Sequence, residues 1–238
     1  MKVKLLESTK DAVNLIYSAC RQCYSARFAA EIFRDKKISK KEKGLFIRKI
    51  VSSGHESPLE HAKFTFAVEG VSRALTHQLV RHRIASYSQQ SQRYVKDESF
   101  SYVTPPVFKS DTLLMKEYES CMKMISGCYS KLIRLLEKKG ITGESANQDA
   151  RFILPQGVET KIVITMNCRE LIHFFNQRCC TRAQWEIRQL AWCMLRICVK
   201  KMPEVFSGIG PKCETLKYCP EGGNFSCGKY PVKKNSGF

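Results

Sequence analysis

Between Arg81 and Tyr94 the chain reads RHRIASYSQQSQRY, a segment with three arginines, one histidine, three serines, three glutamines and no acidic residue. Arginine offers a planar fork of donors that binds phosphate in a bidentate way, and serine hydroxyls and loop amides can supply the remaining bonds. A simpler interpretation stays open, because Arg81 and Arg83 can complement the negative end of a helix dipole, worth about 0.3–1 kcal/mol each. The segment therefore predicts either an anion-binding site or a favourably charged helix end.

A second donor-rich segment, NCRELIHFFNQR, covers residues 167–178. Helical spacing gives it an apolar stripe formed by Leu171, Phe174 and Phe175. Donors recur every four residues on another face, at Arg169, His173 and Gln177. Such a face is either solvated or suited to a pyrophosphate, and the spacing alone does not choose.

Two further segments carry potential metal ligands. GHESPLEH, residues 54–61, contains histidines and glutamates, but its spacing is not the helical i, i+4 pair of a zinc protease and Pro58 interrupts any helix. Its favoured interpretation is a polar loop. In the C-terminal segment Cys213, Cys219 and Cys227 fall short of the four ligands of a structural zinc site. We therefore predict no metal site.

Composition restricts the partners of the chain. Forty lysines and arginines against 22 acidic residues give a formal charge of +18, which favours nucleic acid, a nucleotide or a phosphate-bearing cofactor. A solvated basic surface accounts for the lysine cluster between Lys36 and Lys43. The N-terminal apolar stretch is interrupted by Glu7, Lys10 and Asp11, and no run approaches the roughly 18 apolar residues of a membrane span. We expect a cytoplasmic protein whose twelve cysteines stay reduced.

These segments need elements to position them. Periodicity predicts helices over 9–23 and 41–52, a strand over 64–68, and a helix from Ser72 that ends soon after the basic triplet at 81–83. A loop, strands over 91–95 and 99–103, helices over 110–139 and 144–153, and a strand over 158–166 follow. Asn167 is the expected N-cap of a helix over 168–180, and another helix covers 183–201. Trp185 and the helical spacing of Ile187, Ala191, Met194 and Ile197 predict core positions.

The order of these elements predicts an α+β fold, with a mixed or antiparallel sheet packed with long helices. We expect a single catalytic α+β domain over residues 1–205. Residues 206–238, rich in Gly, Pro, Lys and Cys, are expected to form an irregular C-terminal segment.

The string RHRIASYSQQSQRY resembles the signature of the flavin-dependent thymidylate synthases (the ThyX family), in which Arg-His-Arg is followed at fixed spacing by two serines, an arginine and often a tyrosine. Ser86, Ser91, Arg93 and Tyr94 fall where the signature requires, and the matched segments span roughly residues 50–205. The resemblance implies a homotetramer with active sites at subunit interfaces. It implies the reductive methylation of dUMP to dTMP, with 5,10-methylenetetrahydrofolate as carbon donor and NADPH as reductant through FAD.

The resemblance also implies roles for individual residues. The expected FAD contacts are Ser57, Glu60, Arg81, His82, Arg83, Gln89, Asn167, Arg169 and His173. The expected dUMP contacts are Gln78, Arg81, Gln89, Ser91, Arg93, Arg151 and Arg178. Arg178 and Ser91 are the expected catalytic residues, Arg178 as the group that polarises the uracil. Many members carry Asn and Glu where this chain has Ser88 and Gln89, and a neutral glutamine cannot act as a base.

Two alternatives stay open from sequence. A basic nucleic-acid-binding protein would lay the arginine loops on a phosphate backbone, although no known nucleic-acid motif is present. A flavoenzyme that modifies uracil in RNA would use the same donors on another substrate. Visible flavin absorbance separates the first alternative from the enzymes, and the substrate preference separates the enzymes from each other.

Overall fold

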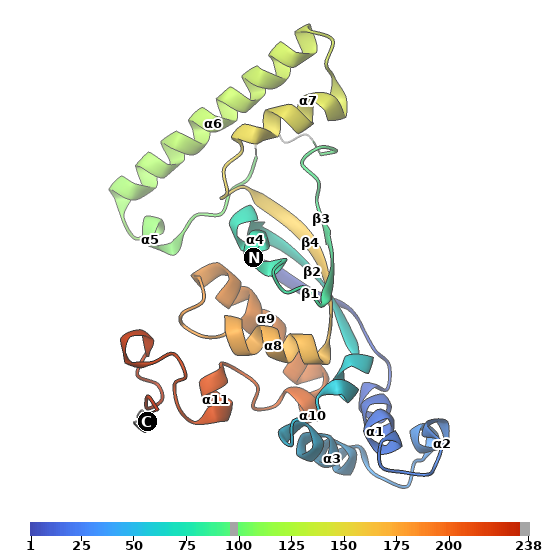
Figure 1. The fold of residues 1–238 in the computed structure, drawn as a ribbon. Coiled ribbons are helices and arrows are strands. Elements are labelled where there is room, and N and C mark those ends of the chain that lie inside the picture. The colour runs from blue at the N-terminus through green and yellow to red at the C-terminus, as the bar shows by residue number, and fades with distance from the viewer. Residues whose placement is uncertain (96–99, 234–238) are drawn as a thin grey trace, which may run out of the picture. The chain divides into compact units, whose positions relative to one another are not determined.

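The computed structural model describes residues 1–95 and 100–233, and Figure 1 traces their helices and strands. The strands are Lys2–Ser8 (β1), Lys63–Ser72 (β2), Ala85–Gln89 (β3) and Glu159–Asn167 (β4). The α-helices are Ala12–Gln22 (α1), Ala29–Arg34 (α2), Lys40–Ser52 (α3), Arg73–Leu79 (α4), Pro106–Lys109 (α5), Thr112–Lys138 (α6), Gly143–Ala150 (α7), Cys168–Arg178 (α8), Trp185–Lys201 (α9), Pro203–Phe206 (α10) and Lys212–Leu216 (α11). Short 3-10 turns cover Ser57–His61 (η1), Arg151–Ile153 (η2) and Gly223–Phe225 (η3).

The four strands form one sheet in the order β1-β2-β4-β3. Its pairing is antiparallel: the N–H of Thr9, just after β1, donates to the carbonyl of Lys63 at the start of β2 (3.0 Å). Likewise, the N–H of Cys168, just after β4, donates to the carbonyl of Ala62 just before β2 (2.8 Å). The predicted α+β class with an antiparallel sheet is confirmed.

The chain divides into two compact units, each with its own core. The first unit contains Met1–Lys2, Val68–Val80 and Ser88–Val163. In it, one apolar cluster joins α6 to α7 through Tyr129, Ile133, Ala146 and Ala150. A second cluster gathers Phe100, Met122 and Val158.

The second unit contains Val3–Ala67, Arg81–Tyr87 and Ile164–Phe238, described as far as residue 233. Phenylalanines from three elements meet in its core, because Phe64 of β2 contacts Phe206 of α10 edge-on at 5.6 Å and Phe175 of α8 lies 6.1 Å from Phe206. All three rings are fully buried. This core fixes the face of α8 that must turn inward and leaves its polar face for other contacts.

The sequence predictions are confirmed for the long elements. Residues predicted as helices fold as α1, α3, α6, α7, α8 and α9, and β2 and β4 cover the two predicted strands with shifted ends. The Oδ1 of Asn167 accepts from the N–H of Glu170 at 2.8 Å, as expected of an N-cap. The stripe of α8 is also buried as predicted, at Leu171, Phe174 and Phe175.

Several local predictions are wrong. Residues 91–95 form a turn instead of a strand, and the preceding segment, predicted as a loop, is β3. The N–H of Gln90 donates to the carbonyl of Lys161 (2.9 Å), so pairing with β4 outweighs the low strand propensity of serine and glutamine. Residues 100–103 hold one isolated bridge, from Tyr102 to Val158, while Ser99 lies outside the described residues.

Three more differences concern helices and the C-terminal segment. α4 ends at Leu79, so the basic triplet follows the helix instead of closing it. Trp185 is partly exposed at the start of α9 and not a core residue. The C-terminal segment contains the short helix α11 and the turn η3, which sequence did not predict, as it did not predict β1, α2, α5 or α10.

Candidate active site

A buried hydrogen-bonded chain links the basic triplet to α8. The side chain of His82, which follows α4, is only 4% exposed and packs edge-on against the ring of Phe174 at 4.9 Å. Its Nδ1 lies 3.1 Å from Oε1 of Glu170, and Nε of Arg178 lies 3.1 Å from its Nε2. The exposed ring of His173 stands 5.8 Å from the His82 ring. Glu170 and Arg178, which follow His82 by 88 and 96 positions, thus both contact its imidazole ring.

The partners fix the tautomer of His82. A guanidinium only donates hydrogen bonds, so Nε2 of His82 must accept from Arg178 and cannot carry a proton. The proton of the neutral ring therefore sits on Nδ1 and is donated to Glu170. Arg178 Nε–H thus donates to His82 Nε2, and His82 Nδ1–H donates to Glu170 Oε1.

Burial keeps this network uncharged at its centre. Burial, and then the electrostatic effects of Arg178 and His173, lower the pKa of His82 to about 4. His82 and Glu170 therefore share a hydrogen bond at neutral pH and not an ion pair. Burial also raises the pKa of Glu170, and burial together with Glu170 raises the pKa of Tyr87. The Tyr87 hydroxyl stays protonated and donates to the carbonyl of His82 at 2.8 Å.

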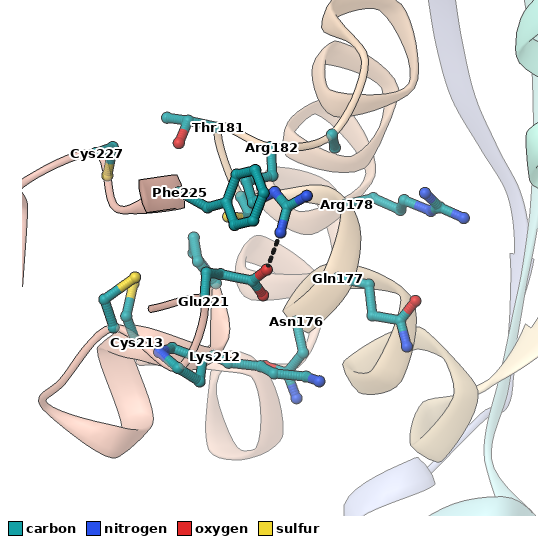
Figure 2. Close-up of a pocket in the computed structure, with 15 residues that line it drawn as sticks. Asn176, Gln177, Arg178, Thr181, Arg182, Lys212, Cys213, Glu221, Phe225 and Cys227 are labelled. Atoms are coloured by element: carbon teal, nitrogen blue, oxygen red, sulfur yellow. Dashed lines mark hydrogen bonds and ion pairs between the residues drawn. The ribbon is translucent and has the colours of Figure 1, made fainter. Parts of the chain in front are cut away.

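Arg178 keeps most of its hydrogen-bonding capacity. It is half-buried at the last turn of α8, and burial lowers the pKa of its guanidinium below the ordinary range, although it remains a cation. Its Nε is used by His82, while within residues 1–95 and 100–233 neither terminal nitrogen has a hydrogen bond or a carboxylate partner. Figure 2 shows the side chain pointing away from Arg182 and Phe225. Two NH₂ groups are thus available for a planar acceptor.

The polar face of α8 borders a cavity of about 390 Å³. Four expected FAD residues line it, namely Glu60, Asn167, Arg169 and His173. The sequence did not predict the other walls, which include Glu56, Ile84, Glu170 and Asn176. Ser57 is exposed at the start of η1 beside Glu56.

Electrostatics differ from one end of this cavity to the other. Arg169 donates through Nη1 to Glu60 at 2.6 Å and through Nε to Glu56 at 3.3 Å, and these bonds raise the pKa of its guanidinium. At the other end, Oδ1 of Asn176 is buried and has no hydrogen-bond partner among the described residues. Nε2 of His173 contacts the amide of Gln177 at 3.0 Å. The cavity offers a paired cation at one end and an unpaired acceptor at the other.

The two outer arginines of the triplet are exposed. Arg81 and Arg83 flank His82 in the turn that leads to β3. Within the described part of the chain, no ion pair involves either guanidinium. Since α4 already ends at Leu79, neither arginine lies within the helix it was expected to close. Both are available to an anion.

In the first unit Gln89 and Gln78 are held by internal bonds. The Nε2 of Gln89 donates to the hydroxyls of Thr76 (3.1 Å) and Thr160 (3.3 Å). The Nε2 of Gln78 donates back to the carbonyl of Ala74 within α4 (3.4 Å). The Gln89 amide nitrogen is therefore directed at threonines, and its oxygen is the atom left to meet a ligand.

The remaining expected dUMP residues lie on the turn after β3 and at the end of α7, also in the first unit. Arg93 forms an ion pair with Glu144, and its carbonyl accepts from Asn147 at 2.9 Å. The hydroxyl of Ser91 accepts from the N–H of Arg93 at 3.1 Å, which shapes the turn. In the part of the chain that the structure describes, the Nε of Arg93 is buried without a hydrogen-bond partner.

Arg151 has a cationic neighbour that sequence did not predict. Burial, and then the charge of Arg151, lowers the pKa of Arg73 at the start of α4. Nε of Arg151 donates to the carbonyl of Gln148 at 3.3 Å. Two neighbouring cations favour an anion between or beside them. Arg73 precedes the signature by eight positions and lacks a motif of its own.

A metal interpretation of the His82 network is disfavoured. Among the described residues, His82, Glu170 and His173 form the one group of three potential ligands whose atoms lie within 4.8 Å of one another. Both ring nitrogens of His82 already have partners, and a cation at Nε2 would displace the Arg178 guanidinium. The histidines and glutamates of residues 54–61 form no such group.

Among the described residues, no helix is long and apolar enough to cross a membrane.

Comparison with known proteins agrees with this geometry. Residues 4–204 match the family model described as thymidylate synthase complementing protein. The chain is 52% identical over 237 residues to a flavin-dependent thymidylate synthase of Nitratidesulfovibrio vulgaris, an alignment that covers 98% of this chain and 97% of that protein. It is 47% identical to proteins of the same name from Clostridium tetani (96% and 94% covered) and Pyrococcus horikoshii (93% and 90% covered).

Neither nucleic-acid binding nor RNA modification appears among these relatives' names. The family model matches most of the chain, and about half of the residues are identical to those of a relative over nearly the full length. Both findings agree with the resemblance found in residues 81–94. The chain belongs to the family of flavin-dependent thymidylate synthases.

Proposed function

We propose that this protein methylates dUMP to dTMP, with FAD as its cofactor and 5,10-methylenetetrahydrofolate and NADPH as co-substrates. Membership of the family supports the reaction class. One observation carries the mechanism: Arg178 donates through Nε to a neutral histidine and keeps both terminal nitrogens for a substrate. The residue roles that follow are inferred from the contacts of each side chain.

Arg178 is the group that activates the uracil. Carbon 5 of the base must become nucleophilic although the ring is electron-poor, so negative charge has to develop on the ring oxygens or nitrogen. A guanidinium aimed at those atoms stabilises that charge most where water is displaced and the cation has no carboxylate partner. His82 is neutral, so it orients Arg178 without neutralising it.

The cavity beside α8 fits a flavin. The unpaired Oδ1 of Asn176 can accept an N–H of the isoalloxazine ring, and the exposed side chain of Ile84 offers an apolar wall. Asn167, Arg169 and His173 would hold the cofactor along the polar face of α8. When bound, FAD supplies the redox chemistry of the reaction.

The carboxylates of this cavity suggest how the cofactor is oriented. Glu56 and Glu60 repel phosphate but accept hydrogen bonds from ribityl or ribose hydroxyls and from the adenine amino group. The exposed cations Arg81 and Arg83 suit the pyrophosphate. We place Ser57 and Glu60 against the sugar or adenine portion and the triplet against the pyrophosphate.

The dUMP phosphate is assigned to Ser91, Arg93 and Arg151. The Ser91 hydroxyl accepts from the Arg93 N–H, so its own proton remains for a phosphate oxygen. Arg93 has a buried Nε with no partner in residues 1–95 and 100–233, and Arg151 stands near a second cation, Arg73. Gln78 and the amide oxygen of Gln89 are assigned to the base or sugar. Ser91 is the second candidate catalytic residue.

We propose that the protein is a homotetramer whose subunits share active sites. α6 is 27 residues long, but its buried side chains are Met122, Tyr129 and Ile133. Leu113 is 80% exposed and Met124 is 66% exposed on the same helix. An apolar surface of this kind favours subunit contact. Light scattering should give four chains, and Leu113→Glu with Met124→Glu should reduce that number, whereas Lys116→Glu on the same helix should not.

The deciding experiment is an assay of dTMP formation by purified protein supplied with dUMP, methylenetetrahydrofolate, NADPH and FAD. We expect turnover that requires all four, together with flavin absorbance in the purified protein. Tritium release from dUMP labelled at carbon 5, and none from labelled RNA, would exclude the RNA-modifying alternative. A colourless protein that neither binds added FAD nor releases tritium would refute the proposal.

A further inference from the structure

Four cysteines from two distant parts of the chain surround one pocket. Cys180 lies in the loop between α8 and α9, and Cys213, Cys219 and Cys227 lie in the C-terminal segment. All four line a pocket of about 390 Å³ within the second unit. Figure 2 shows Cys213 and Cys227 on the same side of it, away from Arg178. The sequence placed three of these cysteines in one segment, and the fold brings a fourth, Cys180, which precedes Cys213 by 33 positions.

Two of these thiols are buried at the pocket. Cys213 and Cys219 are both less than a tenth exposed. Four thiolates at one place repel each other unless a cation lies between them, so the cluster is unfavourable as four anions and favourable as ligands of a divalent metal.

The chain turns sharply beside one of the candidate ligands. Gly228 has φ of 79°, a left-handed conformation that glycine adopts without strain, and it directly follows Cys227. Thr181, in the loop of Cys180, lines the same pocket as Cys227. The pocket therefore brings the C-terminal segment to that loop.

Cations around the pocket suit an anionic centre. A metal dication with four thiolates has a net charge of −2, and Lys212 and Arg182 line the same pocket. Lys229 pairs with Glu214 at 2.6 Å, and Arg182 pairs with Glu221 at 2.7 Å while its guanidinium lies 4.0 Å over the ring of Phe225. These contacts hold the C-terminal segment against the α8–α9 loop.

We propose that Cys180, Cys213, Cys219 and Cys227 bind one Zn²⁺ ion as a four-thiolate structural site. Zinc takes four thiolates at about 2.3 Å in a closed tetrahedron, which leaves no open position for catalysis. No three of the four sulfurs lie within 4.8 Å of one another in this structure. Binding therefore draws the C-terminal segment inward, and the displaced thiol protons pass to solvent. The ion would clamp residues 213–227 to the loop that follows Arg178.

Metal content of the full-length protein tests the proposal directly. The protein should be expressed with added zinc, freed of any histidine tag, and measured by elemental mass spectrometry under reducing conditions. We expect about one zinc per chain in the unsubstituted protein, the stoichiometry of a single closed site. Cys219→Ser and Cys213→Ser should each lose most of it. Cys128→Ser and Cys193→Ser, which change cysteines outside the pocket, should keep it.

Further measurements keep the result interpretable. His173→Asn should leave the zinc content unchanged, which excludes the His82 group as its site. Chelator-treated protein titrated with Co²⁺ should develop a thiolate-to-metal charge-transfer band that Cys219→Ser lacks. Circular dichroism of each variant will show whether the chain still folds, and trypsin should cleave the C-terminal segment faster when zinc is removed. These readouts do not depend on dTMP formation.

Several outcomes would overturn the proposal. Unsubstituted protein that contains no zinc and takes up no cobalt would do so, as would equal zinc in a folded Cys219→Ser variant. Iron with acid-labile sulfide would replace the zinc site by a cluster. A mass two hydrogens lower under non-reducing conditions, mapped to Cys213 and Cys219, would replace it by a disulfide.

Discussion

Arg169 and Arg178 stand on the same helix, yet their surroundings give them opposite properties. Arg169, in the first turn of α8, is exposed and bonded to the carboxylates of Glu56 and Glu60. Arg178, in the last turn, is half-buried and bonded to the neutral ring of His82. The first guanidinium is neutralised by its partners, while the second is held in place without being neutralised.

This difference shows how a protein can orient a cation and keep its charge. A carboxylate beside Arg178 would bind it more strongly but would cancel the field that the uracil needs. A neutral imidazole binds it in one direction only, and Glu170 fixes the imidazole tautomer from behind. Burial of His82 is what keeps the ring neutral, so the packing of the core and the charge at the site are linked.

The largest effect is expected from Arg178→Ala. Loss of a charge-stabilising donor at a developing anion lowers kcat by about 10²–10³-fold. FAD absorbance and FAD affinity should stay near those of the unsubstituted protein, because Arg178 does not line the α8 cavity. Arg178→Lys should recover little of the activity, since lysine lacks the Nε that His82 accepts from.

Arg188→Ala is the matched control for this prediction. Arg188 is a nearby arginine that bonds the carbonyl of Thr181 at 2.9 Å and takes no part in the proposed chemistry. Steady-state kinetics with dUMP should show it close to the unsubstituted protein. Undiminished kcat in Arg178→Ala would remove Arg178 from the mechanism.

The next largest effect is a dependence of stability on pH that originates at His82. Its folded pKa of about 4 lies below the ordinary 6.5, so the unfolded chain binds more protons between these values. Stability from this group is complete above pH 6.5 and is lost as the pH falls toward 4. A difference of this size corresponds to roughly 3 kcal/mol at most.

Urea unfolding at pH 7 and at pH 4.5 measures this loss. Other carboxylates and histidines titrate in the same window, so the relevant quantity is the difference between the unsubstituted protein and His82→Gln. We expect the variant to lose less stability than the unsubstituted protein over that pH range. If both lose the same amount, His82 is not buried as a neutral ring.

Glu170→Gln should have an intermediate effect. The glutamine amide can donate to Nδ1 of His82, which would move the ring proton to Nε2 and face it toward the Arg178 donor. The misoriented guanidinium should lower kcat by about 10–100-fold, which corresponds to roughly 1.4–2.7 kcal/mol. FAD affinity should change much less than kcat. Glu31→Gln, at an exposed ion pair with Arg27 on α2, tests whether any lost carboxylate gives the same kinetics.

The sequence predicted those features of α8 that depend on residues close together in the chain. The N-cap at Asn167 and the buried stripe of α8 depend on residues within a few positions of each other, and both are confirmed. Glu170 illustrates the limit of such reasoning. At the third position of a helix it fits a capping role, yet its carboxylate bonds His82, 88 residues earlier. Only the tertiary fold could reveal that pairing.

The same dependence on distant residues explains the other features that the sequence did not predict. β3 is rich in serine and glutamine, and its strand conformation comes from pairing with β4 far along the chain. Nothing in the sequence distinguishes Cys180 from the other cysteines, but the fold brings it to the pocket of Cys213. The family signature located His82 and Arg178, but spacing did not predict that one donates to the other. Spacing along the chain therefore does not identify the contact partners of the site residues.

The smallest effect is expected at Arg169, the other member of the comparison. Because exposed ion pairs contribute little and Glu56 and Glu60 already neutralise this guanidinium, Arg169→Gln should weaken FAD binding by less than about fivefold. Raising the salt concentration should weaken FAD binding by the unsubstituted protein and by the variant to the same extent. Equilibrium titration with FAD, followed by flavin fluorescence, measures both. A loss of a hundredfold would mean that FAD takes Arg169 away from the glutamates, and Glu56→Gln with Glu60→Gln should then tighten binding.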